Sequence, residues 1–233
     1  MNPNLPIRVL ACDYDETLAC NGRVEAPAFQ ALARFKASGG KVVLITGREL
    51  NDLQSVCPDL RWFDLVVAEN GALLFRPATG EAEALANRPT EDFVQQLTRR
   101  GVRPLSIGRS IVATVRQHLA IVSQTITDMQ LDLEIILNRS SLMILPAGVN
   151  KGTGLMLALE ELQVPPAQVA GIGDAENDDA FLSLCGCYVA VANAIPAIKQ
   201  AADLVTDQEC GAGVVEVIDR ALAGDLSGTQ AHR

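Results

Sequence analysis

The chain has 233 residues, of which 48% are hydrophobic, 4% aromatic and 20% charged, and its formal net charge is −9. This composition excludes a disordered chain and predicts a core built mainly from small aliphatic side chains. An acidic surface repels nucleic acids and anionic membranes, so we expect neither as a partner.

Apolar runs and amphipathic stretches alternate through the first 68 residues. The pattern predicts strands at residues 7–12, 41–45 and 64–68, and helices at residues 26–38 and 48–56. Strands that alternate with helices in this way predict a parallel sheet with right-handed crossover connections.

The pattern changes between Leu73 and Pro146. Here we predict a hairpin, a strand near Leu105, and further elements: helices at 91–100 and 116–129, and closing strands at 133–137 and 142–145 around a turn at 138–141. The first pattern then resumes, with predicted helices at 151–162, 177–184, 195–202 and 214–223 and strands at 169–172 and 188–191.

These elements predict an α/β fold with an inserted module. The core, residues 1–75 and 147–233, is expected to be a Rossmann-like parallel sheet with helices on both faces. Residues 76–146 are expected to form a small α+β domain inserted into this core.

The first candidate site follows the first predicted strand, where the sequence reads Asp13-Tyr14-Asp15-Glu16-Thr17-Leu18. Ligands of parallel sheets collect at the carboxyl ends of the strands. Two carboxylates so close together repel each other, and a bound Mg²⁺ relieves that repulsion. The alternative is that these residues only make turn and helix-cap contacts, and the motif alone leaves both interpretations open.

Two further groups lie at the start of predicted helices. Thr46-Gly47-Arg48 offers a hydroxyl, an open backbone N–H and a helix start, which together suit an oxyanion of phosphate. Lys151 stands where the helix dipole disfavours a cation, which suggests that it neutralises a phosphoryl oxygen or a carboxylate. Each group also has an ordinary interpretation, a capped helix with a solvent-facing arginine or a solvated lysine.

The last group, Gly173-Asp174-Ala175-Glu176-Asn177-Asp178-Asp179, follows the apolar strand predicted at 169–172. An acid at the end of a buried strand is costly unless it is paired or binds a cation. Asp174 and Asp178 are four residues apart and can face the same point. Helix capping alone does not need three aspartates and an asparagine.

Taken in order, DxDxT, hydrophobic-TG, lysine and GDxxND resemble the haloacid dehalogenase superfamily of phosphatases, over residues 13–191. The insert lies between the second and third motifs, as in the type II cap, Cof-like subgroup, where Asn70-Gly71 before the cap is also frequent. A cap this small is similar to the smaller members, including archaeal phosphoglycolate phosphatases and sucrose or mannosylglycerate phosphate phosphatases.

The resemblance implies a mechanism with an aspartyl-phosphate intermediate. Asp13 would be the nucleophile, and Asp15 the general acid and then the general base. The implied phosphate-binding residues are Thr46, Gly47, Arg48, Lys151 and Asn177. The implied Mg²⁺ ligands are Asp13, the backbone carbonyl of Asp15 and Asp174, with Asp178 behind them or joined through water. The implied substrate is a small phosphorylated metabolite, either a sugar phosphate or a phosphoglycolate-like acid.

Several alternatives stay open at this level. The motif usually has glycine where this chain has Glu16, which can point outward, weaken phosphate binding or narrow the substrate range. A phosphomutase of the same superfamily would use the same residues, and a catalytically silent binding module is the third hypothesis. The oligomeric state is open, and so is the role of the polar cap residues Arg103, Arg109, Arg116, His118, Asn138 and Arg139.

The cysteines and the N-terminus indicate the compartment. Six cysteines without a CxxC pair predict buried, reduced thiols in preference to a zinc or redox site: Cys12, Cys20, Cys57, Cys185, Cys187 and Cys210. There is no apolar run of membrane-spanning length and no signal-peptide pattern, so we expect a cytoplasmic protein.

Overall fold

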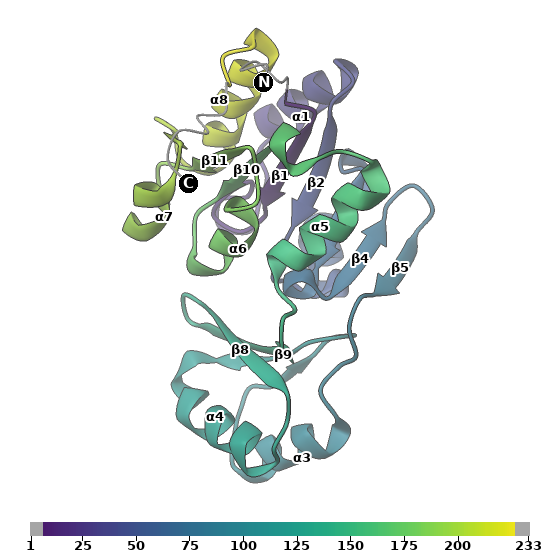
Figure 1. Cartoon of the computed structure of the whole chain (residues 1–233), viewed down its shortest axis with the longest axis vertical. Helices are drawn as coiled ribbons and strands as arrows, with labels where there is room; N and C mark the ends of the chain where they lie inside the picture. The colour runs from purple at the N-terminus through teal and green to yellow at the C-terminus, as the bar shows by residue number, and fades with distance from the viewer. Residues whose placement is uncertain (1–6, 227–233) are drawn as a thin grey trace.

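The computed structural model of the chain describes residues 7–226 and contains two β-sheets (Figure 1). The larger one, here called the core sheet, has the strand order β12-β11-β10-β1-β2-β3-β4-β5. The smaller one, here called the cap sheet, has the order β6-β7-β9-β8 and lies beyond one end of the core-sheet strands.

The core sheet is parallel from β12 to β3 and antiparallel at β4 and β5. Its strands are β1 (Val9–Asp13), β2 (Lys41–Ile45), β3 (Leu65–Ala68), β4 (Leu73–Arg76), β5 (Glu81–Ala84), β10 (Val169–Gly173), β11 (Cys187–Ala190) and β12 (Leu204–Val205). Every residue of β1, β3, β10 and β11 is buried. Continuous apolar runs of this kind are expected where helices cover both faces of a parallel sheet.

Helices flank the core sheet on both faces (Figure 1). They are α1 (Ala26–Ala37), α2 (Leu50–Val56), α5 (Lys151–Leu162), α6 (Asp179–Leu182), α7 (Pro196–Ala201) and α8 (Cys210–Ala223). Helix α1 packs against α8, whereas α5 packs against α6 and against β2 and β3. The predicted α/β fold with a Rossmann-like core is therefore confirmed.

Within residues 7–226, no helix has the length and apolar character needed to cross a bilayer.

The cap sheet has helices on the face turned away from the core sheet (Figure 1). Its elements are β6 (Ser106–Ile107), β7 (Val112–Val115), β8 (Leu133–Asn138), β9 (Ser141–Pro146), α3 (Glu91–Arg99) and α4 (Leu119–Asp128). Successive side chains of a strand point to opposite faces. Leu142 and Ile144 of β9 accordingly pack with the helices, and Met143 and Leu145 join a separate cluster with Ala72 of the core.

Several element boundaries differ from the sequence-based prediction. Strand β5 extends the core sheet, although residues 81–84 fall in the segment that we assigned to the insert. Strands β7 and β12 were not predicted. The helices expected at 116–129 and 177–184 each begin with a 3₁₀ turn, and α8 begins four residues before the predicted 214. The division into domains at residues 76 and 146 remains a prediction.

Candidate active site

The site lies at the carboxyl ends of the central strands, where the chain order of the core sheet reverses. Strand β1 lies between β2 and β10, so successive strands are added outward on either side of it. Such a switch point opens a crevice at the strand ends. Asp13 ends β1, Thr46 follows β2 and Asp174 follows β10, so all three lie at this edge.

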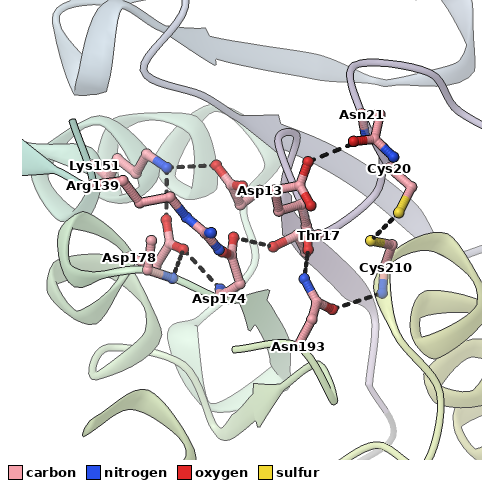
Figure 2. Close-up of polar contacts among 12 residues, drawn as sticks. Asp13, Thr17, Cys20, Asn21, Arg139, Lys151, Asp174, Asp178, Asn193 and Cys210 are labelled. Carbon is pink, nitrogen blue, oxygen red and sulfur yellow. Dashed lines mark hydrogen bonds and ion pairs between the residues drawn. The ribbon is translucent and has the colours of Figure 1, made fainter. Parts of the chain in front are cut away.

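Lys151 joins two of the predicted carboxylates. Its Nζ donates to Oδ1 of Asp13 at 2.5 Å and to Oδ1 of Asp178 at 2.6 Å, and all three side chains are buried (Figure 2). Lys151 is the first residue of α5, whose free N–H groups are capped by the side chain of Asn150. Lys151 therefore forms ion pairs with the carboxylates at the strand ends, and it is not the solvated residue of the ordinary interpretation.

Burial and charge act on this group together. Burial raises the pKa of the Asp13 carboxyl well above its usual value, and the charge of Asp178 raises it further, whereas Lys151 opposes both. Burial alone would lower the pKa of the Lys151 ammonium, but Asp13 and Asp178 outweigh burial and raise it. Lys151 therefore keeps a positive charge beside the Asp13 carboxyl.

Both carboxylate oxygens of Asp178 are engaged by the protein. Oδ1 accepts from Lys151, and Oδ2 accepts from the backbone N–H groups of Asp174 and Ala175, each at 2.9 Å. A Cβ at Gly173 would stand 2.9 Å from Oδ2 of Asp178, so this position requires glycine. Through these contacts, Asp178 holds Lys151 and the backbone of Asp174 in place.

Asp174 is approached from the core and from the cap sheet. Thr17 Oγ1 donates to Oδ1 of Asp174 at 2.9 Å, and the Arg139 guanidinium forms an ion pair with Oδ2 (Figure 2). Arg139 lies in the two-residue turn between β8 and β9. Burial raises the pKa of Asp174, as does the charge of Asp178, whereas Arg139 and Thr17 lower it.

Three carboxylates of this site fit a divalent cation. Asp13, Asp174 and Asp178 each offer an oxygen, and these oxygens lie within 4.8 Å of one another. All three residues are buried. Hard oxygen ligands suit Mg²⁺ or Ca²⁺, and a cation there would offset the cost of burying several carboxylates together.

Asp15 is held apart from these carboxylates. Arg48 donates to its two oxygens, from Nε at 2.8 Å and from Nη2 at 2.7 Å, and donates to Asp52 from Nη1 at 2.6 Å. We expected Arg48 to bind phosphate, but in the structure its guanidinium pairs with two aspartates instead. The Asp15 side chain is 38% exposed and lines the same cavity as Asp13.

The other predicted phosphate-binding residues have identifiable partners. The Thr46 hydroxyl accepts from the Arg48 N–H at 3.1 Å. The Asn177 amide donates from Nδ2 to Oδ1 of Asn70 at 2.9 Å. Within residues 7–226, the buried atoms Asn70 Nδ2 and Asn177 Oδ1 have no hydrogen-bond partner. Unpaired buried polar atoms are costly, so these two are suited to a bound water or ligand.

A cavity of about 450 Å³ separates the strand ends from the cap sheet. The core supplies Asp13, Asp15, Gly47, Arg48, Glu49 and Asp52, and the cap sheet and its loops supply Ser106, Ile111, Ala113, Asn138, Arg139, Ser140, Ser141 and Met143. Of the six cap candidates, Asn138 and Arg139 line this cavity. Ser140 and Ser141 were not among the predicted site residues, although they lie in the predicted 138–141 turn, and Met143 follows closely in β9. Ser106 lies in β6, and no sequence signal pointed to it.

Glu69 connects the core to a cap loop beside the cavity. Its buried carboxylate accepts backbone N–H groups from Arg109 at 3.0 Å, Ser110 at 2.6 Å and Ile111 at 3.1 Å. The Glu69-Asn70-Gly71 segment is a 3₁₀ turn, not the hairpin turn that Asn-Gly favours. Sequence alone gave no signal for these contacts.

Glu16 turns away from the buried carboxylates. Its side chain accepts the Asn21 N–H at 3.1 Å, and its carbonyl accepts from Nδ2 of Asn193 at 2.6 Å. Glu16 has a φ of 59°, in the left-handed region that glycine adopts without a steric penalty. This backbone conformation is the physical reason why the motif usually has glycine here, and the glutamate fits by pointing outward.

The sequence profile of the family described as haloacid dehalogenase-like hydrolase matches residues 10–108 and 135–218. The chain belongs to this family. Phosphoglycolate phosphatase 2 of Saccharolobus solfataricus is 34% identical over 94% of each chain, and phosphoglycolate phosphatase of Haloarcula marismortui is 30% identical over 90% of this chain and 95% of its own. The family predicted from the four motifs is confirmed, and the protein is a phosphatase, a phosphoric monoester hydrolase.

Solved structures share the fold. A haloacid dehalogenase-like hydrolase from Bacteroides thetaiotaomicron superposes with a TM-score of 0.78 at 19% identity, over 91% of this chain and 98% of its own. At this level of identity, the likeness bears on the fold alone.

Proposed function

We propose that this phosphatase hydrolyses a small phosphorylated carboxylic acid of the 2-phosphoglycolate type, with Mg²⁺ as cofactor and Asp13 as nucleophile. The observation that carries the proposal is the buried group of Asp13, Lys151, Asp174 and Asp178 beneath a cavity that the cap sheet closes. The substrate class is supported by the two relatives named phosphoglycolate phosphatase, which match at least 90% of this chain.

In the proposed reaction, the Asp13 carboxylate attacks phosphorus and forms an aspartyl phosphate. Lys151 lies 2.5 Å from Oδ1 of Asp13, where its charge can also stabilise an oxygen of the phosphoryl group. Thr46 and the Gly47 N–H stand at the next strand end and suit the same group. A Cβ at Gly47 would stand 3.2 Å from Met143 Sδ. Glycine at this position therefore leaves room for a phosphoryl group to reach the Gly47 N–H.

Asp15 is the proposed proton carrier. It gives a proton to the leaving alcohol oxygen in the first step and takes a proton from water in the second, so that the sum is ester plus water giving alcohol and phosphate. Arg48 fixes the plane of the Asp15 carboxyl through two parallel hydrogen bonds. The partial exposure of Asp15 allows exchange of protons with solvent.

The proposed Mg²⁺ ligands are Asp13, Asp174 and the Asp15 carbonyl. Asp178 is proposed to act behind them, because its contacts hold Lys151 and the backbone N–H groups of Asp174 and Ala175 in place. Bound Mg²⁺ supplies positive charge that lets an anionic nucleophile approach an anionic ester.

Arg139 is the proposed partner of the substrate carboxylate. It comes from the cap sheet, lines the cavity and is 49% exposed at its side chain, and it reaches the same region as the buried aspartates. A guanidinium binds a carboxylate through two hydrogen bonds. A sugar phosphate has no such carboxylate, so the place of Arg139 supports the phosphoglycolate-like class in this proposal.

The test measures phosphate release from 2-phosphoglycolate, from a panel of sugar phosphates and from p-nitrophenyl phosphate, with Mg²⁺ or EDTA. Asp13→Asn should abolish turnover of all of them. Arg139→Gln should lower kcat/KM for 2-phosphoglycolate by about 10- to 100-fold, the loss expected for a charged hydrogen-bonded pair. The exposed Arg99 of α3 provides the control variant Arg99→Gln.

The aryl ester distinguishes the two roles of Arg139, which also contacts Asp174. A disturbed metal site would slow both esters equally, whereas a lost carboxylate partner slows 2-phosphoglycolate selectively. Faster turnover of a sugar phosphate than of 2-phosphoglycolate would refute the substrate class. Conversion of a sugar phosphate to its isomer without free phosphate would identify the phosphomutase instead.

A further inference from the structure

Two cysteines face each other beside the loop that follows β1. Sγ of Cys20 and Sγ of Cys210 are 2.7 Å apart (Figure 2). Cys20 is partly exposed and Cys210 is buried at the start of α8. We predicted buried, reduced thiols, so the partial exposure of Cys20 departs from that prediction, and nothing in the spacing of residues 20 and 210 indicated this pair.

Backbone hydrogen bonds hold both cysteines in place. The Cys20 N–H donates to the Arg23 carbonyl at 3.0 Å, and the Arg23 N–H donates to the Cys20 carbonyl at 3.1 Å. The Cys210 N–H donates to Oδ1 of Asn193 at 2.9 Å, and Nδ2 of the same Asn193 donates to the Glu16 carbonyl at 2.6 Å. The closeness of the sulfurs therefore follows from two fixed backbone segments rather than from one adaptable side chain.

Cys210 also adopts a costly backbone conformation. Its φ is 47°, in the left-handed region that non-glycine residues rarely occupy. The next residue is Gly211, whose Cβ, if present, would stand 2.8 Å from the Leu18 carbonyl oxygen. A cysteine is thus kept in a strained position while its neighbour allows α8 to approach the loop closely. Such strain persists where the surroundings fix the residue, and it marks candidate functional positions.

We infer that Cys20 and Cys210 form a reversible disulfide. A shared zinc ion is the competing explanation, because Glu16 also lies within reach of both sulfurs. Two thiolates on one tetrahedral zinc ion stand about 3.8 Å apart, given Zn–S bonds of about 2.3 Å. The observed 2.7 Å is closer to the S–S bond length of about 2.05 Å than to that spacing, and the Glu16 carboxylate already accepts the Asn21 N–H.

The oxidant is a low-molecular-weight disulfide, such as oxidised glutathione, which acts by thiol–disulfide exchange. A cavity of about 370 Å³ beside the pair, lined by Cys20, Arg23 and Cys210 among others, gives it access. The Cys20 thiolate attacks one sulfur of the oxidant and releases one thiol. Cys210 then loses its proton to solvent and attacks Cys20 Sγ, which releases the second thiol. Two cysteine thiols and one external disulfide thus give one protein disulfide and two external thiols.

The bond joins the loop after the nucleophile's strand to the first turn of α8. It closes a loop that spans most of the chain, and long closed loops restrict the unfolded state most. We therefore expect oxidation to raise Tm by roughly 5–15 °C. Burial raises the pKa of the Cys210 thiol, and its contact with Cys20 raises it further, so the closing step should accelerate with rising pH.

The experiment compares the full chain after incubation with oxidised glutathione or with dithiothreitol. Unreduced tryptic digests should then contain residues 9–23 joined to residues 200–220, and dithiothreitol should separate them. Because Cys12 lies in the first peptide, fragment ions between residues 12 and 20 assign the bond. Cys20→Ser and Cys210→Ser should lose both the cross-link and the rise in Tm, whereas the buried Cys57→Ser should keep both.

Three results would overturn the inference. The first is that an alkylating reagent still modifies both Cys20 and Cys210 after the folded protein has been incubated with oxidised glutathione. The second is that glutathione stays attached to Cys20 without displacement by Cys210. The third is stoichiometric Zn²⁺ binding by the reduced protein that is lost in both serine variants, because this would identify the pair as zinc ligands.

Discussion

Glu69→Gln should weaken the junction between the core and the cap loop without altering any contact of Asp13. Glu69 is 1% exposed, and its oxygens accept three backbone N–H groups from residues 109–111. Glutamine keeps the shape but has one oxygen. With that oxygen toward Ser110 and Ile111, its NH₂ group faces the Arg109 N–H, and two donors then oppose each other.

The expected loss follows from these contacts. One hydrogen bond disappears, and two charge-assisted bonds of about 1.5–3 kcal/mol become neutral bonds of about 1 kcal/mol. We therefore expect the free energy of unfolding to fall by at least about 2.5 kcal/mol, and Tm by at least roughly 5 °C for a chain of this size. Because Ile111 lines the cavity, KM for the substrate should also rise.

Urea unfolding of Glu69→Gln, wild type and Glu160→Gln measures the effect. Glu160 is exposed on α5, so its substitution controls for the loss of one negative charge. Surface substitutions usually change stability by less than about 0.5 kcal/mol. If Glu69→Gln falls within that margin of the control, the three N–H contacts do not hold the loop and the reasoning fails.

Three further substitutions test single contacts. Gly71→Ala should destabilise the protein by more than about 2 kcal/mol in urea, because φ is 105° and a Cβ would stand 1.9 Å from the Asn150 carbonyl oxygen. Arg48→Lys should lower kcat about tenfold with little change in KM, because lysine cannot hold both oxygens of Asp15. Burial raises the pKa of Tyr14 to about 12, so the neutral phenol favours folding and wild-type stability should fall between about pH 10 and pH 12. Tyr14→Phe should show a smaller fall in urea titrations across that window.

The core could be predicted from the sequence because its signals are local. Apolar β-branched runs mark buried parallel strands wherever they occur. The acids at 13 and 174 were placed at one edge of the sheet because parallel strands share their carboxyl ends. Strand β12 has only two residues and is defined by its pairing with β11, so no local sequence pattern could reveal it. Strand β7, at Val112–Val115, did carry a β-branched signal that the prediction missed.

Side-chain partners were harder to predict, because they depend on the path of the whole chain. The pairing of Arg48 with Asp15 joins residues 33 positions apart, and Lys151 reaches Asp13 across 138 positions. The motif order indicated that these residues share a site. It could not indicate that Arg48 faces a carboxylate instead of phosphate. A guanidinium can bind two oxygens of a planar carboxylate as well as two oxygens of a tetrahedral phosphate.

Formal charge explains why an acidic protein can handle an anionic ester at this point. Beneath the cavity, the three carboxylates of the cluster face two cations, Lys151 and Arg139. A phosphate ester would add to this negative excess in a buried setting, where unpaired charge is most costly. A divalent cation held by these carboxylates would restore the balance next to the proposed nucleophile. Without such an ion, the cluster would add local negative charge to the net charge of −9, so substrate binding at this edge should depend on the cation.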